Sequence, residues 1–390
     1  MDDGRSLTGE DLRWIEVDHA RIAANVRAMK SLLGPASLWA VVKAQGYGHG
    51  AVEVARTALA AGAAGLAVAS VEEGVELRQA GIEAPVLVLT PAQPAQARSI
   101  ARHRLTAALS DMPAAEALAA AGRSLGEAVP VHVKVDTGMG RFGVLPEDAV
   151  AFVRRARQFS GLAVEGAFTH LAAADEEDLG PARVQLARFS NAVRDLEREG
   201  LKPPLVHCAN SAAAVSLPES RFDLARVGIA LYGLYPSDAV RRRAKAAGIV
   251  LQPAMTFRAR VLAVRQVPAG WTVGYGHTFV ASRPTVVATL AAGYAAGLAR
   301  GLSHKGEVLL AGQRRPIIGR ICMNHCMVDA GDLPVRPGDV ATLLGADGGS
   351  AVTAEDWAGH LGTIPYEVVC LVGGRNPRRH LAEAAAGNAS

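Results

Sequence analysis

From residue 38 to about residue 230 the sequence alternates between short runs of Val, Leu and Ala and longer amphipathic segments, most of them ended by Gly or Pro. Short apolar runs are typical of buried parallel strands, and amphipathic segments are typical of the helices that cover them. The expected strands are Leu38–Val42, Gly65–Ala69, Val86–Leu89, Thr106–Leu109, Val131–Val135, Ala163–Thr169, Leu205–His207 and Asp223–Val227.

Helical patterns lie between these strands. They cover Val52–Ala61, Val71–Ala80, Pro113–Ala121, Glu147–Gln158 and Pro181–Arg198. Eight strands alternating with helices predict an α/β fold with a (β/α)₈ TIM barrel. An open doubly wound sheet is the second choice, and the lack of a Gly-x-Gly-x-x-Gly after any strand counts against it.

The pattern changes after Leu251. Strands are expected at Thr256–Val267, Thr285–Ala292, Gly306–Ala311, Arg315–Val328 and Asp339–Leu344, and a helix only at Ala354–Leu361. This predicts an N-terminal barrel at residues 12–245 and a mainly β domain at residues 246–385, with the boundary in the charged stretch Ser237–Gly248. A helix is expected at Asp18–Leu33, and a strand at residues 13–17 is a candidate partner of the β domain.

Composition narrows the possible partners. The net charge of the 390 residues is only +4, and the basic clusters are scattered, so no nucleic-acid surface is expected. The uncharged, Ala-rich stretch Thr57–Val71 is shorter than the roughly 18–20 residues of a membrane span, and no secretory signal is visible. The four cysteines form no Cys-x-x-Cys pair and are read as reduced thiols. We therefore expect a cytoplasmic protein that binds no membrane.

Polar residues interrupt the apolar pattern where several strands end. They are Lys43, Lys134, Asp136, His170, His207, Asn210, Ser211 and Arg226, and Gly228 follows the eighth strand in the same way. Each alone has an ordinary explanation, such as a chain returning to solvent. Because the carboxyl ends of all strands meet at one mouth of a barrel, the set together indicates an active site there.

Lys43 lies in Val-Val-Lys-Ala-Gln-Gly-Tyr-Gly-His-Gly, directly after a strand. Partial burial favours the neutral amine, which is the form needed for Schiff-base chemistry. Asn210 and Ser211 follow the seventh strand, and Gly228 and Ile229 follow the eighth. Those two loops of a barrel commonly hold a phosphate. A lysine together with a phosphate site favours pyridoxal 5'-phosphate (PLP) as the cofactor, and no metal site is expected.

The motifs resemble those of alanine racemases, PLP enzymes with a barrel and a β domain. The resemblance runs from about residue 12 to 380. The stretches that carry it are Lys43–Gly50, Val131–Gly143, Thr169–Asp175, His207–Ala212, Arg226–Pro236, Val273–His277, Gly293–Gly297, Gly319–Asp329 and Gly362–Cys370. It implies an amino-acid racemase, an isomerase that converts L-alanine to D-alanine and supplies D-alanine for cell-wall peptidoglycan.

The resemblance also implies roles for single residues. Lys43 is similar to the Schiff-base lysine, which moves the Cα proton on one face of the cofactor, and Tyr275 to the tyrosine that does so on the other. In the family this tyrosine comes from the partner subunit, which implies a homodimer with shared active sites. Arg226 resembles the arginine that faces the pyridine nitrogen and leaves it unprotonated. His207 resembles the residue that links Arg226 onward, and His170 the ring stacked on the pyridine.

Further matched positions concern the cofactor phosphate and the substrate. Tyr47, Ser211, Gly228, Ile229 and Tyr366 resemble the phosphate ligands. Arg141 would bind the substrate carboxylate, and Lys134 matches a position that is carbamylated in many relatives. From the partner, Met323 would donate a backbone N–H to the substrate, and Tyr294 would line the entrance.

The chain departs from the family pattern at three places. Asn324 and Ala296 stand where many relatives have Asp, and Gln45-Gly46 replaces Asn-Ala after the lysine. Two rival functions are a PLP decarboxylase, which Arg226 disfavours, and a PLP carrier, which the β domain disfavours. Cys322, His325 and Cys326 could also be read as a metal fragment, although core packing is the favoured interpretation.

Overall fold

The computed structural model describes residues 11–381 and divides the chain into two compact units. The barrel unit comprises Arg21–Gly46 and Ala51–Gln252. The β unit comprises the described residues up to Ala20, the short segment Tyr47–Gly50 and the residues from Pro253 onward. The chain passes into the β unit after Gln252, somewhat beyond the charged stretch expected to hold the boundary.

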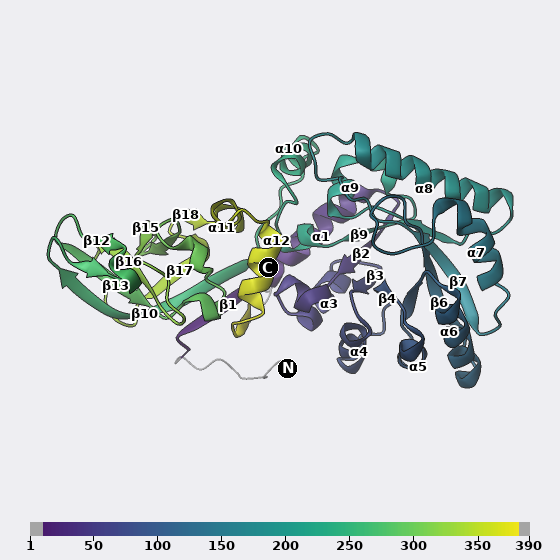
Figure 1. Ribbon diagram of the computed structural model, residues 1–390, viewed down its shortest axis with the longest axis horizontal. Coiled ribbons are helices and arrows are strands. Elements are labelled where there is room, and N and C mark those ends of the chain that lie inside the picture. The colour runs from purple at the N-terminus through teal and green to yellow at the C-terminus, as the bar shows by residue number, and fades with distance from the viewer. Residues whose placement is uncertain (1–10, 382–390) are drawn as a thin grey trace, which may run out of the picture. The chain divides into compact units, whose positions relative to one another are not determined.

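Eight parallel strands form the sheet of the barrel unit (Figure 1). They are β2 (Ser37–Val41), β3 (Gly65–Val68), β4 (Val86–Pro91), β5 (Thr106–Leu109), β6 (Val129–Lys134), β7 (Leu162–Phe168), β8 (Leu205–His207) and β9 (Leu224–Val227), in the order β8-β7-β6-β5-β4-β3-β2-β9. The Asp223 N–H donates to the Val206 carbonyl at 3.1 Å, and the Arg226 N–H donates to the Ala209 carbonyl at 2.9 Å. These hydrogen bonds join β9 to β8, the strands at the two ends of the sheet, and so close the barrel. The predicted barrel with its eight strands is therefore confirmed.

Helices lie around this sheet (Figure 1). They are α1 (His19–Leu33), α2 (Lys43–Tyr47), α3 (Ala51–Ala60), α4 (Val71–Gln79), α5 (Ala97–Arg102), α6 (Met112–Leu125), α7 (Ala149–Ala156), α8 (Gly180–Arg198), α9 (Ser211–Ser216) and α10 (Asp238–Ala246). Side chains cap several N-termini. Ser70 forms a capping box with Glu73 at α4, and Asp111, Asn210 and Ser237 accept backbone N–H groups at α6, α9 and α10.

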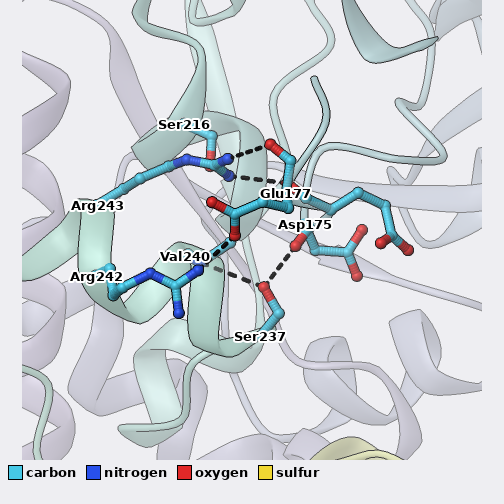
Figure 2. Close-up of polar contacts among 8 residues, drawn as sticks. Asp175, Glu177, Ser216, Ser237, Val240, Arg242 and Arg243 are labelled. Atoms are coloured by element: carbon cyan, nitrogen blue, oxygen red, sulfur yellow. Dashed lines mark hydrogen bonds and ion pairs between the residues drawn. The ribbon is translucent and has the colours of Figure 1, made fainter. Parts of the chain in front are cut away.

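The stretch expected as the domain boundary instead forms α10, which binds the loop after β7 (Figure 2). Arg243 donates to the backbone carbonyls of Glu176 and Glu177 at 3.0 and 2.8 Å, and Arg242 forms an ion pair with the Glu177 carboxylate. The Ser237 hydroxyl both caps α10 and donates to the Asp175 carbonyl. These contacts hold the loop that follows His170 against the barrel.

The β unit is built on a nine-stranded sheet in the order β18-β17-β14-β15-β16-β13-β10-β1-β19. The strands are β1 (Arg13–Asp18), β10 (Met255–Val267), β13 (Thr285–Leu290), β14 (Glu307–Leu310), β15 (Gln313–Ile318), β16 (Cys326–Gly331), β17 (Val340–Asp347), β18 (Ser350–Val352) and β19 (Arg378–Leu381). A two-stranded sheet is formed by β11 (Thr272–Val273) and β12 (Phe279–Val280). The strand β1 pairs antiparallel with β10 and parallel with β19.

Two expectations for the β unit are wrong. Arg315–Val328 is not one strand, because a loop at residues 319–325 separates β15 from β16. Gly319 starts this loop at φ 68°, and a Cβ there would lie 2.6 Å from the Val273 carbonyl oxygen. The helix α11 (Ala354–Leu361) is not the only one, because α12 (Pro365–Gly373) follows it. Pro365 occupies the first turn of α12, where a missing N–H has no consequence.

The segment Tyr47–Gly50 packs on α12 within the β unit. Gly48 has φ +84°, and a Cβ there would lie 2.5 Å from the Val369 carbonyl oxygen and 2.9 Å from Cα of Gly373. Arg378 in β19 donates from Nε to the Gly48 carbonyl at 2.9 Å. Only glycine allows this approach. Among residues 11–381, no helix has the length and apolar character needed to span a membrane.

Candidate active site

The polar residues singled out at the strand ends lie together at one mouth of the barrel unit. Lys134 and His207 are the last residues of β6 and β8, Arg226 lies in β9, and Lys43 and His170 follow β2 and β7. The positive charges of Arg226, Lys134, Arg141 and Lys43 all act on His170, after burial, to lower its pKa. The barrel unit therefore gathers these groups as the sequence predicted.

Arg226 is the centre of the buried part of this cluster, with 3% of its surface exposed. Its guanidinium donates to Nδ1 of His207 at 2.7 Å and to the carbonyls of Thr169 and Cys208 at 2.9 and 3.2 Å, and lies 3.4 Å from Nδ1 of His170. None of these acceptors within the described chain is a carboxylate. Burial accordingly lowers the pKa of Arg226 to about 10, which leaves it a cation at neutral pH.

The hydrogen bond from Arg226 assigns the protons along a row of two histidines. An arginine can only donate, so Nδ1 of His207 must accept and the proton of neutral His207 sits on Nε2. This Nε2 lies 2.8 Å from Nδ1 of His132, which must accept in turn. The proton of His132 is then on Nε2, which has no hydrogen-bond partner in the described chain. Both rings are neutral, since burial lowers their pKa, that of His132 to about 3.

His132 is a site residue that sequence reasoning missed. It is 1% exposed, and its ring occupies the space in which a Cβ on Gly166 would lie, 2.5 Å from the ring. The available signal was its position two residues before Lys134 in a strand, which places both side chains on the same face. Val133, between them, faces the helices and packs with Val153 and Leu196.

Lys134 is buried and carries no acidic partner in direct contact within the described chain. Its Nζ lies 4.3 Å from the ring centroid of Phe168, and that ring stacks on His207 with centroids 4.9 Å apart. Burial first, and then the charges of Arg226 and Arg141, hold the pKa of Lys134 well below its usual value. Burial and these charges thus shift Lys134 toward its neutral amine, which is the nucleophilic form of lysine.

The loop that carries Arg141 is folded around the carboxylate of Asp136. Oδ1 of Asp136 accepts the N–H groups of Gly138, Met139 and Gly140 at 2.9, 2.9 and 3.2 Å, and Oδ2 accepts that of Arg141 at 3.2 Å. Burial alone would raise the pKa of Asp136, but these four donors lower it below the usual value. The backbone of Arg141 is thus fixed, while its side chain remains exposed.

Lys43 is followed by a turn in the left-handed region. Ala44, Gln45 and Gly46 have φ of 52°, 55° and 59°, and the Gly46 N–H donates to the Val42 carbonyl at 2.8 Å. Only one of these three residues is a glycine, and the other two carry side chains. Left-handed backbone costs a non-glycine residue about 1–2 kcal/mol, so the turn stores strain beside the lysine.

The residues of the barrel unit that are expected to bind a phosphate lie close to one another. Asn210 caps α9, and its Oδ1 accepts the Ala213 N–H at 2.9 Å. The Ser211 hydroxyl accepts the Gly228 N–H at 2.9 Å and that of Ala230 at 3.5 Å, on either side of Ile229. The loops after β8 and β9 are thus joined by one hydroxyl group.

The remaining predicted residues lie in the β unit. Tyr275 follows β11 with 70% of its surface exposed, and Tyr294 and Met323 are 39% and 54% exposed. Tyr294 and Ala295 donate backbone N–H groups to the carbonyls of Cys322 and Met323, so these two loops lie side by side. Tyr47 and Tyr366 have ring centroids 6.1 Å apart.

The metal alternative finds no support in the described chain. Within residues 11–381, no three His, Cys, Asp or Glu side chains gather in a way that could hold a metal ion. Cys326 is fully buried in β16, where burial raises its pKa to about 12, while Met323 to His325 are exposed.

Comparison with known proteins identifies the family of this chain. Two family models match the chain, "Alanine racemase, N-terminal domain" over residues 17–236 and "Alanine racemase, C-terminal domain" over residues 254–380. Alanine racemase of Desulfovibrio desulfuricans is 44% identical over 94% of this chain and 97% of its own length. That of Symbiobacterium thermophilum is 44% identical over 97% of this chain and 100% of its own length.

Solved structures give the same result. The crystal structure of alanine racemase from D-cycloserine-producing Streptomyces lavendulae has a TM-score of 0.89 and 40% identity, covering 95% of this chain and 97% of that one. Alanine racemase from Streptomyces coelicolor has a TM-score of 0.89 and 38% identity over 96% and 99% of the two chains. The chain belongs to the alanine racemase family of isomerases.

Proposed function

We propose that this protein racemises alanine with PLP, with Lys43 and Tyr275 as the two groups that move the Cα proton. It acts as a cytoplasmic homodimer in which each active site takes Lys43 from one subunit and Tyr275 from the other. Its product, D-alanine, supplies peptidoglycan synthesis.

The observation that carries this proposal is the environment of Arg226. A buried guanidinium held only by histidine and carbonyl acceptors is suited to face a pyridine nitrogen without protonating it. PLP decarboxylases of this architecture usually place a carboxylate, not an arginine, against the pyridine nitrogen. In the described chain no carboxylate bonds to Arg226, which supports a racemase over a decarboxylase.

The donor set of the barrel mouth fits PLP. Lys43 would hold its aldehyde carbon, Arg226 its ring nitrogen, and His170 would stack on its ring. Asn210, Ser211, Gly228 and Ile229, with Tyr47 and Tyr366 of the β unit, would hold its phosphate. When bound, PLP withdraws electrons from the substrate and so acidifies its Cα–H bond.

The protein residues supply the proton transfers. Racemisation requires removal of a proton on one face and return of a proton on the other, so two groups on opposite faces are needed. Nζ of Lys43 serves one face and Oη of Tyr275 the other. Arg141, on its loop fixed by Asp136, binds the substrate carboxylate together with the backbone N–H of the partner subunit's Met323. A carbamate formed from the neutral Lys134 amine and CO₂, with loss of one proton, would be an anion suited to hold the Arg141 guanidinium.

The shared active site rests on the exposure of Tyr275. A phenol that acts as an acid or base has to be held by neighbouring groups, yet 70% of Tyr275 is exposed in the single chain. Met323 and Tyr294 are also exposed apolar residues on nearby loops of the β unit. A second subunit would cover all three.

The test is a racemisation assay of the purified full-length protein with added PLP. We expect D-alanine to form from L-alanine, and L-alanine from D-alanine, with deuterium entering at Cα in heavy water. Release of CO₂ would indicate a decarboxylase, and PLP binding without turnover would indicate a carrier. Lys43→Ala should abolish activity, and Tyr275→Phe should impair abstraction from L-alanine more than from D-alanine.

Mixing the two inactive variants tests whether sites are shared. Consider a mixed dimer of one Lys43→Ala subunit and one Tyr275→Phe subunit. If the sites are shared, one site receives the intact Lys43 and the intact Tyr275, and the other site receives both substitutions. Random exchange should therefore restore roughly a quarter of the wild-type sites. If each subunit held both groups of its own site, mixing would restore none.

A further inference from the structure

Two glutamates of α4 hold the turn that follows Lys43. Ala44 donates its backbone N–H to Oε1 of Glu73 at 2.6 Å. Gln45 donates from Nε2 to both carboxylate oxygens of Glu76, at 3.1 and 2.8 Å. Glu73 and Glu76 are three residues apart and so project from the same side of the helix. The turn is thus bound to α4 at two successive residues.

Glu73 also belongs to the capping box of α4. Its Oε2 accepts the N–H groups of Ala69 and Ser70 at 2.7 and 3.3 Å, while its own N–H donates to the Ser70 hydroxyl at 3.3 Å. One carboxylate therefore collects backbone donors from the loops after β2 and after β3. Hydrogen bonds to an ionised acceptor are stronger than those between neutral groups, so Glu73 is well suited to hold both loops.

The turn requires such a hold because its backbone is strained. Ala44 and Gln45 adopt left-handed angles without being glycine, and strained residues persist only where their surroundings fix them. The direction in which the Lys43 side chain leaves the backbone depends on this turn. We propose that Glu73 is the positioning residue for Lys43, acting through its bond to the Ala44 N–H. This inference rests on the proposed role of Lys43 as the cofactor lysine.

The decisive variant is Glu73→Asp, which keeps the charge but shortens the side chain by one methylene. The capping box itself tolerates aspartate, since α11 of this chain uses Asp356 in the same position with Thr353 as its cap. The variant should therefore keep the cap of α4 and lose the bond to Ala44. Ser70→Ala is the matched control, because it removes the hydroxyl of the cap and leaves the bond between Glu73 and Ala44.

The first measurement is hydrogen exchange of the full chain with added PLP, read from peptides that cover residues 42–50. We expect the Ala44 amide to exchange about 10- to 100-fold faster in Glu73→Asp than in the wild type, the effect of losing one charge-assisted hydrogen bond. Ser70→Ala should change it less than about threefold. Equal acceleration in both variants would show that Glu73 acts only as a cap, and would overturn the proposal. Unchanged exchange in Glu73→Asp would overturn it as well.

The second measurement is borohydride trapping of PLP on Lys43, followed by mass spectrometry of the labelled peptide. The rate at which added PLP becomes fixed to Lys43 should fall about tenfold in Glu73→Asp and stay near the wild-type rate in Ser70→Ala. An equal rate in all three proteins contradicts the positioning role. If the wild type itself fixes no PLP on Lys43, the proposed function fails, whereas the exchange comparison still decides whether Glu73 holds the turn.

Discussion

The neutral state of His132 makes the stability of the barrel depend on pH, and this dependence can be isolated by one substitution. Burial and the nearby charge of Arg226 lower the pKa of His132 from 6.5 to about 3. Below pH 6.5 the unfolded chain binds a proton that the folded chain does not, so the free energy of unfolding falls as the pH falls toward 3. The loss is about 1.4 kcal/mol per pH unit and approaches about 5 kcal/mol at pH 3.

His132→Asn removes this proton site. The amide oxygen of asparagine lies near the place of Nδ1 and can still accept from His207, but it cannot be protonated in this range. At pH 7 the variant should be less stable than the wild type, because the smaller side chain leaves a cavity. Between pH 6.5 and 4.5 the free energy of unfolding of the wild type should fall by about 2 kcal/mol relative to that of the variant, since only the wild type loses stability through this residue.

Guanidinium unfolding at pH 7.5, 6.5, 5.5 and 4.5 would measure this gap. Tryptophan fluorescence is a suitable signal, because Trp39 is the only tryptophan of the barrel unit and its ring lies 5.9 Å from that of His132. The exposed His360 of the β unit provides the control variant His360→Asn, which removes a histidine without touching the buried pair. A gap between the wild type and His132→Asn that does not change with pH would refute the assignment of a neutral, buried His132.

Three further outcomes are expected. Gly48→Ala should lower the free energy of unfolding by about 2 kcal/mol or more, because its Cβ would meet the backbone of α12. The control Gly34→Ala, at φ +64° with open space around it, should lower this free energy by only about 1 kcal/mol. Thermal unfolding would measure both. Asp136→Asn loosens the loop that carries Arg141, the proposed ligand of the substrate carboxylate. It should therefore raise the KM for alanine about tenfold and change kcat less, as steady-state assays would measure. Cys208 and Cys326, whose pKa burial raises to about 12, should resist maleimide at pH 8 until the protein is unfolded, as mass spectrometry of the labelled peptides would detect.

The barrel could be predicted because its strands are short apolar runs at regular intervals. The β unit was harder, since several of its strands follow one another after very short turns, such as the two residues between β14 and β15. The loop between β15 and β16 was missed because Ile321, Cys322 and Met323 continue the apolar pattern, and only the left-handed Gly319 marks the turn. The helix α12 begins at Pro365, a residue that disrupts the interior of a helix but is tolerated in its first turn, so the sequence around it gives a weak helical signal.

The site residues at strand ends were found because a polar side chain after an apolar run is conspicuous. His132 was not, since it lies inside its strand and its role depends on a contact with a residue 75 positions away. Glu73 was hidden for a similar reason. Its sequence pattern, Ser-x-x-Glu, indicates a helix cap, and the additional bond to Ala44 follows only from how two barrel loops approach each other.

The pairing of β1 with both β10 and β19 bears on the order of events during synthesis. The strand at Arg13–Asp18 leaves the ribosome first, but its partners begin only at Met255 and Arg378. At about 5–20 residues per second, β1 waits roughly ten seconds or more for its first neighbour. During that interval the complete barrel sequence emerges, so the nascent chain carries an unpaired N-terminal strand that a chaperone could cover until translation reaches the last strand.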